Sequence, residues 1–426
     1  MNDAGNGASE QPVPVQGASR SAFGFIFVTV LLDMMALGVT IPVLPKLVES
    51  FLNNDTAAAA RWFGLFGTVW ALMQFLFSPL FGALSDRFGR RPIVLMSNFG
   101  LAFDYVLMAL APSLWWLFLG RVISGITAAS VATAFAYIAD VTAPEKRAAA
   151  FGLIGAAFGA GFVLGPAIGG LLGGLDPRLP FWLAAGFSFA NALYGLFILP
   201  ESLPRDRRAP FRWRNANPVG SLRLLRANRG LLGLAAINFI SQLAHVVLPS
   251  AVVLYVGHRY GWDATMVGIT LAMVGVCSIV VQSLLIGPVV KRLGERRSAL
   301  LGFAFGAAGF AVYALAPVGY LIWLGIPLQA LWGLAGPSLQ ALMSRLVSPT
   351  QQGQLQGANT SVASVAQLFG PGIFTLTLAW SVGSGMPMWL SGAPFLLAAL
   401  MLVGAGVLSA VLIAKPQDAA PRSAEI

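Results

Sequence analysis

The sequence predicts an all-α integral membrane protein with twelve transmembrane helices in two pseudo-symmetric six-helix bundles. Three observations predict it: the composition, the number of apolar stretches and an internal repeat. Hydrophobic residues make up 57% of the 426 residues and charged residues only 10%, whereas a soluble domain carries about 25% charged residues. Because a helix needs about 20 apolar residues to cross a bilayer core, we count the spans from the apolar runs.

Apolar runs between charged or Pro/Gly-rich breaks predict the twelve spans. The first six are 22–47, 62–84, 92–111, 114–139, 149–173 and 180–199, and the last six are 231–256, 265–290, 298–316, 319–345, 353–380 and 388–413. They form an N-terminal bundle over 22–200 and a C-terminal bundle over 230–413, joined by a linker at 201–229 that holds eight arginines. We expect residues 1–21 and 414–426 to be disordered tails, because they are poor in residues that could build a core.

The basic residues predict the orientation. Of the 26 lysines and arginines, 21 fall on one side of the predicted membrane, four fall on the other, and Arg121 lies inside a span. The positive-inside rule therefore places both termini and the linker in the cytoplasm. The net charge of +10 follows from the same bias, so we expect no nucleic-acid partner.

The two halves repeat each other. Glycine and proline positions of the first half recur at an offset of 205 residues, with Gly82, Gly89, Gly165 and Pro166 matching Gly287, Gly294, Gly370 and Pro371. Two halves in parallel repeat imply alternating access, with a binding site between them near the middle of the membrane.

Three charged residues lie deep in the predicted spans. Among the 16 acids only Asp33 and Asp104 do so, and Arg121 is the only deep base. Burial favours a neutral carboxyl group, whereas a nearby guanidinium favours the carboxylate. A carboxyl group balanced between the two can bind and release a proton, so we predict a proton-coupling site. The alternative is a fixed ion pair that holds the first, third and fourth spans together.

Polar side chains on the seventh span form a second candidate site. Asn238, Gln242 and His245 fall on one helix face, which predicts a substrate-binding wall that faces the two acids. Gln282 and Gln340 are weaker candidates of the same kind. The alternative for the amides is hydrogen bonding between helices, and His245 is either a second titrating group or a hydrogen-bonded core histidine.

Two local motifs accompany these sites. GALSDRFGRRP, residues 82–92, predicts a tight turn between the second and third spans, in which Asp86 can pair with Arg90. Its copy at 287–297 has Lys291 in place of the acid, so we expect a complete latch only in the first half. GAAFGAGFVLGPAIGG, residues 155–170, has small residues that let one helix lie close to a neighbour and flex.

Both motifs resemble those of a known family. The 82–92 turn resembles the signature of the major facilitator superfamily, and 155–170 resembles the antiporter helix of its drug-efflux branch. Together with LLDMMALGVTIPVLPKL, WALMQ, FDY and GQLQG, the chain resembles the tetracycline-efflux family over nearly its whole length. The resemblance implies a major facilitator fold and a proton-coupled drug exporter of the bacterial inner membrane. In that family the substrate is a tetracycline chelated to a divalent cation.

The resemblance also implies roles for individual residues. Gln74 would join Asn238, Gln242, His245, Gln282 and Gln340 in binding substrate, beside the proton-coupling residues Asp33, Asp104 and Arg121. Gly82, Asp86, Arg87, Gly89, Arg90 and Asp140 would form a cytoplasmic gate. Gly155, Gly159, Gly165, Pro166 and Gly169 would form the antiporter helix.

The chain departs from the family pattern at three places. Gly306 stands where tetracycline exporters carry a third membrane carboxylate, Val246 replaces a glutamine, and Ala128 replaces a glycine. We therefore expect proton-coupled efflux of small amphipathic drugs, with tetracycline a poor substrate. The alternative is a proton-coupled symporter that imports a small nutrient or metabolite, which suits the fold but not the antiporter helix.

The sequence offers no constellation for an enzyme. It has two histidines and one cysteine and contains no HExxH motif, so no catalytic or metal site is predicted. We expect no cofactor, because the proton gradient supplies the energy and any metal would arrive as part of a chelated substrate. The expected partners are the lipid bilayer, a drug and protons, and we expect a monomer.

Overall fold

The computed structural model describes residues 18–127, 133, 137, 138, 140–142, 147–208, 225, 229–347, 351–383 and 385–414. Over these residues the chain is helical, and ten helical stretches are long and apolar enough to cross a membrane. One of them, Ala264–Leu315, contains two of the predicted spans, and Leu114–Thr127 is the described beginning of the fourth. The predicted all-helical membrane class is confirmed. Most of 1–21, much of 201–229 and most of 414–426 lie outside the described residues.

The helices of the first half begin and end within a few residues of the predicted spans. They are α1 (Ala18–Thr40), α2 (Leu44–Ser50), α3 (Thr56–Phe88), α4 (Arg90–Ala109), α5 (Leu114–Thr127), α7 (Arg147–Leu175) and α8 (Leu179–Ile198). The first predicted span is broken between α1 and α2, where Pro42 and Pro45 each lack the N–H that a continuous helix needs. The Asp55 side chain caps α3 by accepting a hydrogen bond from the backbone N–H of Ala58 at 2.9 Å.

The helices of the second half contain more breaks. They are α9 (Arg229–His245), α10 (Val247–Tyr260), α11 (Ala264–Val280), the π-turn η5 (Val281–Leu285), α12 (Ile286–Leu315), α13 (Ile322–Leu331), η7 (Trp332–Leu334), α14 (Ala335–Ser344), α15 (Gln352–Ser381) and α16 (Ala393–Ala414). The break between α9 and α10 falls within one turn before Pro249, and η5 falls within one turn before Pro288. Both follow from the missing proline N–H, which leaves the carbonyl four residues earlier without its helical partner.

The internal repeat is visible in the backbone of the two equivalent turns. Gly89, between α3 and α4, has φ 106° and ψ 160°, and Gly294, inside the stretch assigned to α12, has φ 76° and ψ 163°. Residues with a side chain rarely adopt positive φ, so both turns require glycine. The predicted tight turn is present in both halves, and Gly294 separates the eighth span from the ninth.

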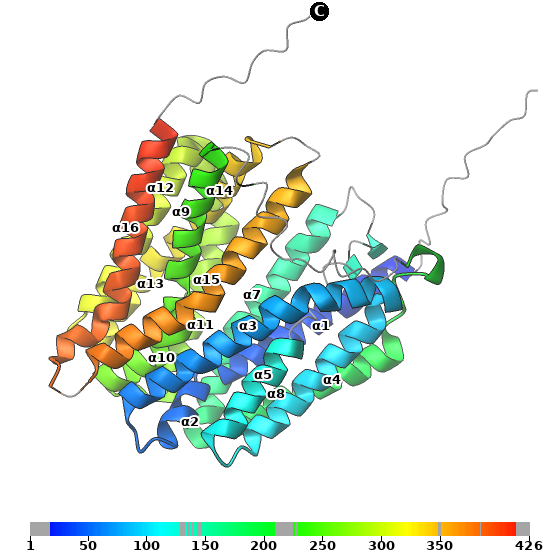
Figure 1. The fold of residues 1–426 in the computed structure, drawn as a ribbon, viewed down its shortest axis with the longest axis horizontal. Coiled ribbons are helices and arrows are strands. Elements are labelled where there is room, and N and C mark those ends of the chain that lie inside the picture. Colours follow the sequence, from blue (N-terminus) through cyan, green and yellow to red (C-terminus); the bar gives the residue numbers. More distant parts are fainter. Residues whose placement is uncertain are drawn as a thin grey trace, which may run out of the picture.

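The two halves meet mainly through two helix pairs, α3 with α15 and α7 with α11, and α10 also contacts α2 and α3. Glycines allow close approach at both: a Cβ built on Gly64 would lie 2.0 Å from Thr375 Oγ1, and one on Gly170 would lie 2.5 Å from the Ala264 carbonyl oxygen. We call the end of the molecule where Gly89 and Gly294 lie the basic end. Figure 1 shows α3 and α15 together near α10, at the opposite end, and diverging towards the basic end.

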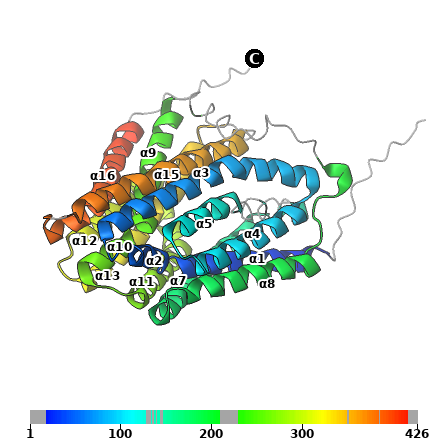
Figure 2. The ribbon, with the colours of Figure 1, turned by 60° about the horizontal axis from the view of Figure 1, so that its bottom comes forward.

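Within the first half, α1 packs against both α7 and α8, and α4 packs against α5 and α8 (Figure 2). This arrangement places α1, α4, α5 and α8 around the deep charged residues. The helices therefore position the candidate proton-coupling site inside the first half.

Candidate functional site

The first part of the site is an ion pair between α4 and α5. Arg121 Nη2 lies 3.7 Å from Asp104 Oδ2, and it also donates to Met108 Sδ at 3.1 Å. Asp104 is fully buried and Arg121 is only 9% exposed. Gly120 permits the approach of the helices, because a Cβ there would lie 2.7 Å from Asp104 Oδ1. The structure thus brings together two of the three predicted charged residues.

The second part is Asp33 on α1, which is 7% exposed. Its Oδ1 accepts a hydrogen bond from Asn191 Nδ2 of α8 at 2.9 Å, and the same nitrogen donates to the Thr29 carbonyl oxygen at 3.1 Å. Sequence reasoning missed Asn191, although it is the only amide side chain within the predicted sixth span.

Tyr105 connects the two parts. This buried side chain of α4 lies within electrostatic range of Asp33, Asp104 and Arg121. The three predicted proton-coupling residues therefore occupy one neighbourhood inside the first half.

The predicted wall on the seventh span lies on α9. Gln242 and His245 are exposed and Asn238 is half-buried, and the His245 ring lies 5.5 Å from the ring of Trp332. Both carboxyl groups are buried inside the first half, so in this conformation the wall does not face an exposed acid.

The remaining substrate candidates have mixed surroundings. Gln74 is half-buried on α3, and Gln282 is exposed in the π-turn η5. Gln340 on α14 accepts a hydrogen bond from Asn359 Nδ2 of α15 at 2.6 Å. The contact of Gln340 is the one expected of a residue that joins two helices.

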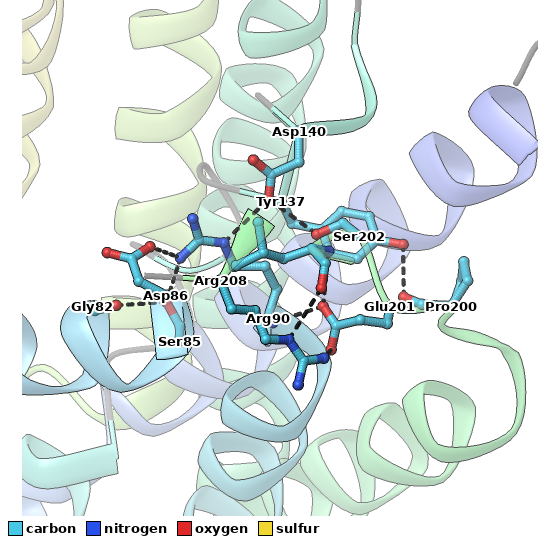
Figure 3. A network of polar contacts seen from close by, with 11 residues as sticks. Gly82, Ser85, Asp86, Arg90, Tyr137, Asp140, Pro200, Glu201, Ser202 and Arg208 are labelled. Atoms are coloured by element: carbon cyan, nitrogen blue, oxygen red, sulfur yellow. Dashed lines mark hydrogen bonds and ion pairs between the residues drawn. The ribbon is translucent and has the colours of Figure 1, made fainter. Parts of the chain in front are cut away.

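The predicted gate residues converge at the basic end (Figure 3). Arg90 Nη1 lies 2.5 Å from Asp86 Oδ1 and donates to Ser85 Oγ at 2.6 Å, and Arg90 Nε lies 3.1 Å from Asp140 Oδ2. Arg90 is 9% exposed as a residue. A buried guanidinium with two carboxylate partners joins the 82–92 turn to the end of the fourth span.

Residues after α8 join this network, and sequence reasoning missed them. Glu201 Oε1 accepts from the backbone N–H of Arg90 at 2.8 Å and of Leu203 at 3.0 Å, and Ser202 Oγ donates to Asp140 Oδ2 at 3.1 Å (Figure 3). Arg208 Nη2 lies 3.8 Å from Glu201 Oε2. An acid directly after the last span of the first half was the available signal.

Three other predicted gate residues, Arg87, Gly89 and Gly82, make no ion pair in the described part of this network. Arg87 is exposed, with its guanidinium carbon 5.1 Å from the centre of the Phe88 ring. A Cβ on Gly89 would lie 2.2 Å from Glu201 Oε2, whereas one on Gly82 would meet no non-local atom within 4 Å. Gly89 is required by both its backbone angle and its neighbour, and Gly82 is not.

Over the residues that the structure describes, the second half has one ion pair at the basic end, whereas Arg90 in the first half has two carboxylate partners. Arg345 Nη2 pairs with Glu295 Oε1. The repeat offset of 205 carries Arg90 to Glu295 and Asp140 to Arg345, so the pair is retained with its charges exchanged. The Arg345 side chain is 67% exposed, which makes this pair weaker than its counterpart.

The candidate antiporter helix α7 packs tightly on α1. A Cβ on Gly165 would lie 2.7 Å from Gly38 Cα, and one on Gly169 would lie 2.0 Å from the Val39 carbonyl oxygen. Pro166 faces both halves, since a Cβ on Gly38 would lie 2.8 Å from its Cδ and one on Gly268 would lie 2.5 Å from its carbonyl oxygen.

The other two glycines of this set differ. A Cβ on Gly159 would meet Ile279 at an ordinary 3.6 Å, so close packing does not require glycine there. Gly155 lies within α7, and its packing is outside what the structure describes.

Two of the three positions that depart from the family pattern, Gly306 and Val246, are closely packed. A Cβ on Gly306 would lie 2.7 Å from Leu402 and 2.8 Å from Trp332, so aromatic and aliphatic side chains fill the space of the absent carboxylate. Val246 is buried, and its Cγ1 would lie 2.6 Å from a Cβ on Gly370. Ala128 lies outside the described residues.

Comparisons with known proteins cover nearly the whole chain. The family model of the Major Facilitator Superfamily matches residues 26–371 and, in a second match, 234–425. The class C tetracycline resistance protein of Escherichia coli is 40% identical over 392 residues, which are 92% of this chain and 98% of that protein. The class G tetracycline resistance protein of Vibrio anguillarum is 38% identical, over 88% of this chain and 95% of that protein.

One solved structure resembles the chain in both fold and sequence. The crystal structure of the human organic anion transporter MFSD10 matches with a TM-score of 0.67 and 25% identity, over 92% of this chain and 99% of that one. The helical architecture is therefore shared with a protein that is described as an organic anion transporter.

Proposed function

The chain belongs to the major facilitator superfamily, and on that basis we propose that it exports small amphipathic drugs in exchange for protons. It is a membrane transporter and not an enzyme. Export proceeds by alternating access between the two halves, which is the mechanism that a parallel repeat of six-helix bundles supports.

The observation that carries the proton-coupled part is the pair of buried carboxyl groups in the first half. A carboxylate at the bilayer centre costs about 2.5–3.5 kcal/mol on insertion scales, so helices held only for packing rarely keep one. Asp104 has Arg121 as its counter-charge and Asp33 has the Asn191 amide. Each partner favours the carboxylate while burial favours the neutral acid, and the balance lets both groups load and release protons.

Export is the direction that the antiporter-like string at 155–170 favours. We assign the basic end to the cytoplasm, because the lysines and arginines concentrate there. In this conformation the halves meet at the opposite end and diverge towards the basic end (Figure 1). We propose that the protein lies in the inner membrane of a bacterium with both termini in the cytoplasm, and that it works as a monomer.

The substrate class follows from the second half. Gln242 and His245 are exposed hydrogen-bonding side chains on α9, and the His245 ring lies beside the ring of the buried Trp332. The relatives are named for tetracycline resistance, so tetracycline is a candidate substrate. With Gly306 in place of a third carboxylate, the second half has less attraction for a metal chelate, and we propose a broader and weaker selection of amphipathic drugs.

Everted membrane vesicles test this proposal. Cells expressing the chain are broken into inside-out vesicles, a proton gradient is imposed, and uptake of a panel of cationic, neutral and tetracycline drugs is followed. The proposal predicts uphill uptake that a protonophore abolishes. Uptake of every drug at the rate of vesicles without the protein would overturn it.

A further inference from the structure

A polar cluster lies between α1 and α8, enclosed by the first half. Thr29 and Asp33 of α1 lie beside Asn191 of α8, and Ser188 lies one turn before Asn191 on the same helix. Asp33 is 7% exposed, and the other three are 1% exposed or less. Within this cluster, Asn191 Nδ2 donates one hydrogen bond to Asp33 Oδ1 and one to the Thr29 carbonyl oxygen.

Part of this cluster is unsatisfied. Thr29 Oγ1, Ser188 Oγ and Asn191 Oδ1 are buried and have no hydrogen-bond partner in the described structure. A buried polar atom without a partner costs about 1–3 kcal/mol. The amide of Asn191 is thus half used, because its nitrogen donates twice while its oxygen accepts nothing.

The chemistry of an acid beside an amide identifies a donor for the unpaired Asn191 Oδ1. An ionised Asp33 only accepts hydrogen bonds, and Asn191 Nδ2 supplies one. A protonated Asp33 carries an O–H donor, and the unpaired Asn191 Oδ1 belongs to the amide that already contacts the Asp33 carboxyl group. The existing N–H bond then persists and a second bond forms antiparallel to it. One added proton makes one O–H bond, and no other covalent bond changes.

Titratable side chains occur on two of the helices that pack around Asp33, α4 and α8. Tyr105 on α4 lies within electrostatic range of Asp33, with Asp104 and Arg121 also in its range. Tyr194 is on α8, one turn beyond Asn191. The part of α7 over 157–175, which packs on α1, contains no titratable side chain. The side chain of α8 in direct hydrogen-bond contact with the Asp33 carboxyl group is therefore the neutral amide of Asn191.

We infer that Asn191 is a positioning residue for proton coupling, which holds ionised Asp33 through Nδ2 and neutral Asp33 through both Nδ2 and Oδ1. The inference rests on the proposed function, in which Asp33 carries a proton. Protonation of Asp33 then adds one hydrogen bond to the contact between α1 and α8. The strength of this contact changes with the proton, whereas the charge on α8 does not change.

Infrared difference spectroscopy of the purified protein in lipid, between alkaline and acidic pH, tests the inference. The neutral carboxyl C=O band that disappears in Asp33→Asn belongs to Asp33. We expect Asn191→Leu to move this band to higher wavenumber, because the carboxyl group loses both hydrogen bonds. The same variant should slow drug–proton exchange about tenfold, the equivalent of about one hydrogen bond. A band at the wild-type wavenumber in Asn191→Leu would overturn the inference.

Asn98→Leu is the matched control. Asn98 is a fully buried amide on α4 whose side-chain atoms have no partner in the described structure, and we expect its loss to leave the Asp33 band in place. If Asn191→Leu does not insert, Asn191→Ala repeats the measurement with the same expected shift. An Asp33 band that is present but unmoved by the Asn191 variants overturns only this inference. Identical spectra of the wild type and Asp33→Asn would overturn both the inference and the proton-carrying role of Asp33.

Discussion

Replacing Gly169 with alanine tests whether α7 must lie against α1 for transport. The added Cβ would lie 2.0 Å from the carbonyl oxygen of Val39, 2.7 Å from its carbonyl carbon and 2.8 Å from its Cα. Ordinary contact between such atoms is about 3.5 Å, so relieving the shortest contact separates the two backbones by roughly 1.5 Å. No flexible side chain can give way, because all three contacts are backbone atoms.

The expected cost is that of overpacking, about 1–3 kcal/mol. If the whole cost falls on the transport cycle, turnover decreases by about 5- to 150-fold. Gly159→Ala is the matched control on the same helix, because its Cβ would meet Ile279 at 3.6 Å and the change in backbone freedom is the same.

The assay is drug uptake into everted vesicles, normalised to the amount of inserted protein, together with the thermal unfolding midpoint in detergent. We expect Gly169→Ala to lose uptake and stability and Gly159→Ala to stay within twofold of the wild type. Equal uptake by the two variants would refute the argument that close contact of α7 with α1 matters.

Three further predictions concern the gate, the ion pair and the substrate. Asp86→Asn should slow turnover without weakening drug binding, because Asp86 lies 2.5 Å from Arg90 in the gate network. Lys291→Gln changes an exposed residue and should slow turnover much less. Equal loss of turnover in the two variants would contradict this asymmetry. Arg121→Gln leaves Asp104 without its counter-charge and should destabilise the protein by about 3–5 kcal/mol. Adding Asp104→Asn should restore the unfolding midpoint but not transport. A single variant as stable as the double variant would argue against the ion pair. In a drug-sensitive bacterium the chain should confer resistance to several cationic and neutral amphipathic drugs, and strong resistance confined to tetracyclines would show that a third carboxylate is dispensable.

The sequence predicted the architecture well because membrane spans are set by length and hydropathy. Helix boundaries agree within a few residues, and the offset of 205 residues correctly placed the turns at Gly89 and Gly294. The helix breaks near Pro249 and Pro288 were not predicted, because apolar runs continue through them.

The site was only partly predictable. Charge at depth pointed to Asp33, Asp104 and Arg121, but hydropathy does not say which face of a helix meets which neighbour. The contact between Asp33 and Asn191 therefore required the packing of α1 on α8. The pair of Glu295 with Arg345 was within reach of the sequence, because applying the repeat offset to the first-half pair identifies it.

The wall on α9 shows a different limit. Its spacing correctly grouped Asn238, Gln242 and His245 on one helix. Spacing could not show that both acids are buried inside the other half in this conformation. Which groups face each other depends on the relative position of the halves, and that position changes during alternating access.

Drug-driven proton movement in proteoliposomes tests the central claim most directly. The purified chain is reconstituted with a pH-sensitive dye inside the vesicles, and a drug gradient is applied to the wild type, Asp33→Asn and Asp104→Asn. We predict that the drug gradient moves protons in the opposite direction through the wild type, and that neither variant moves protons although both insert. Proton movement at the wild-type rate in both variants would contradict the account.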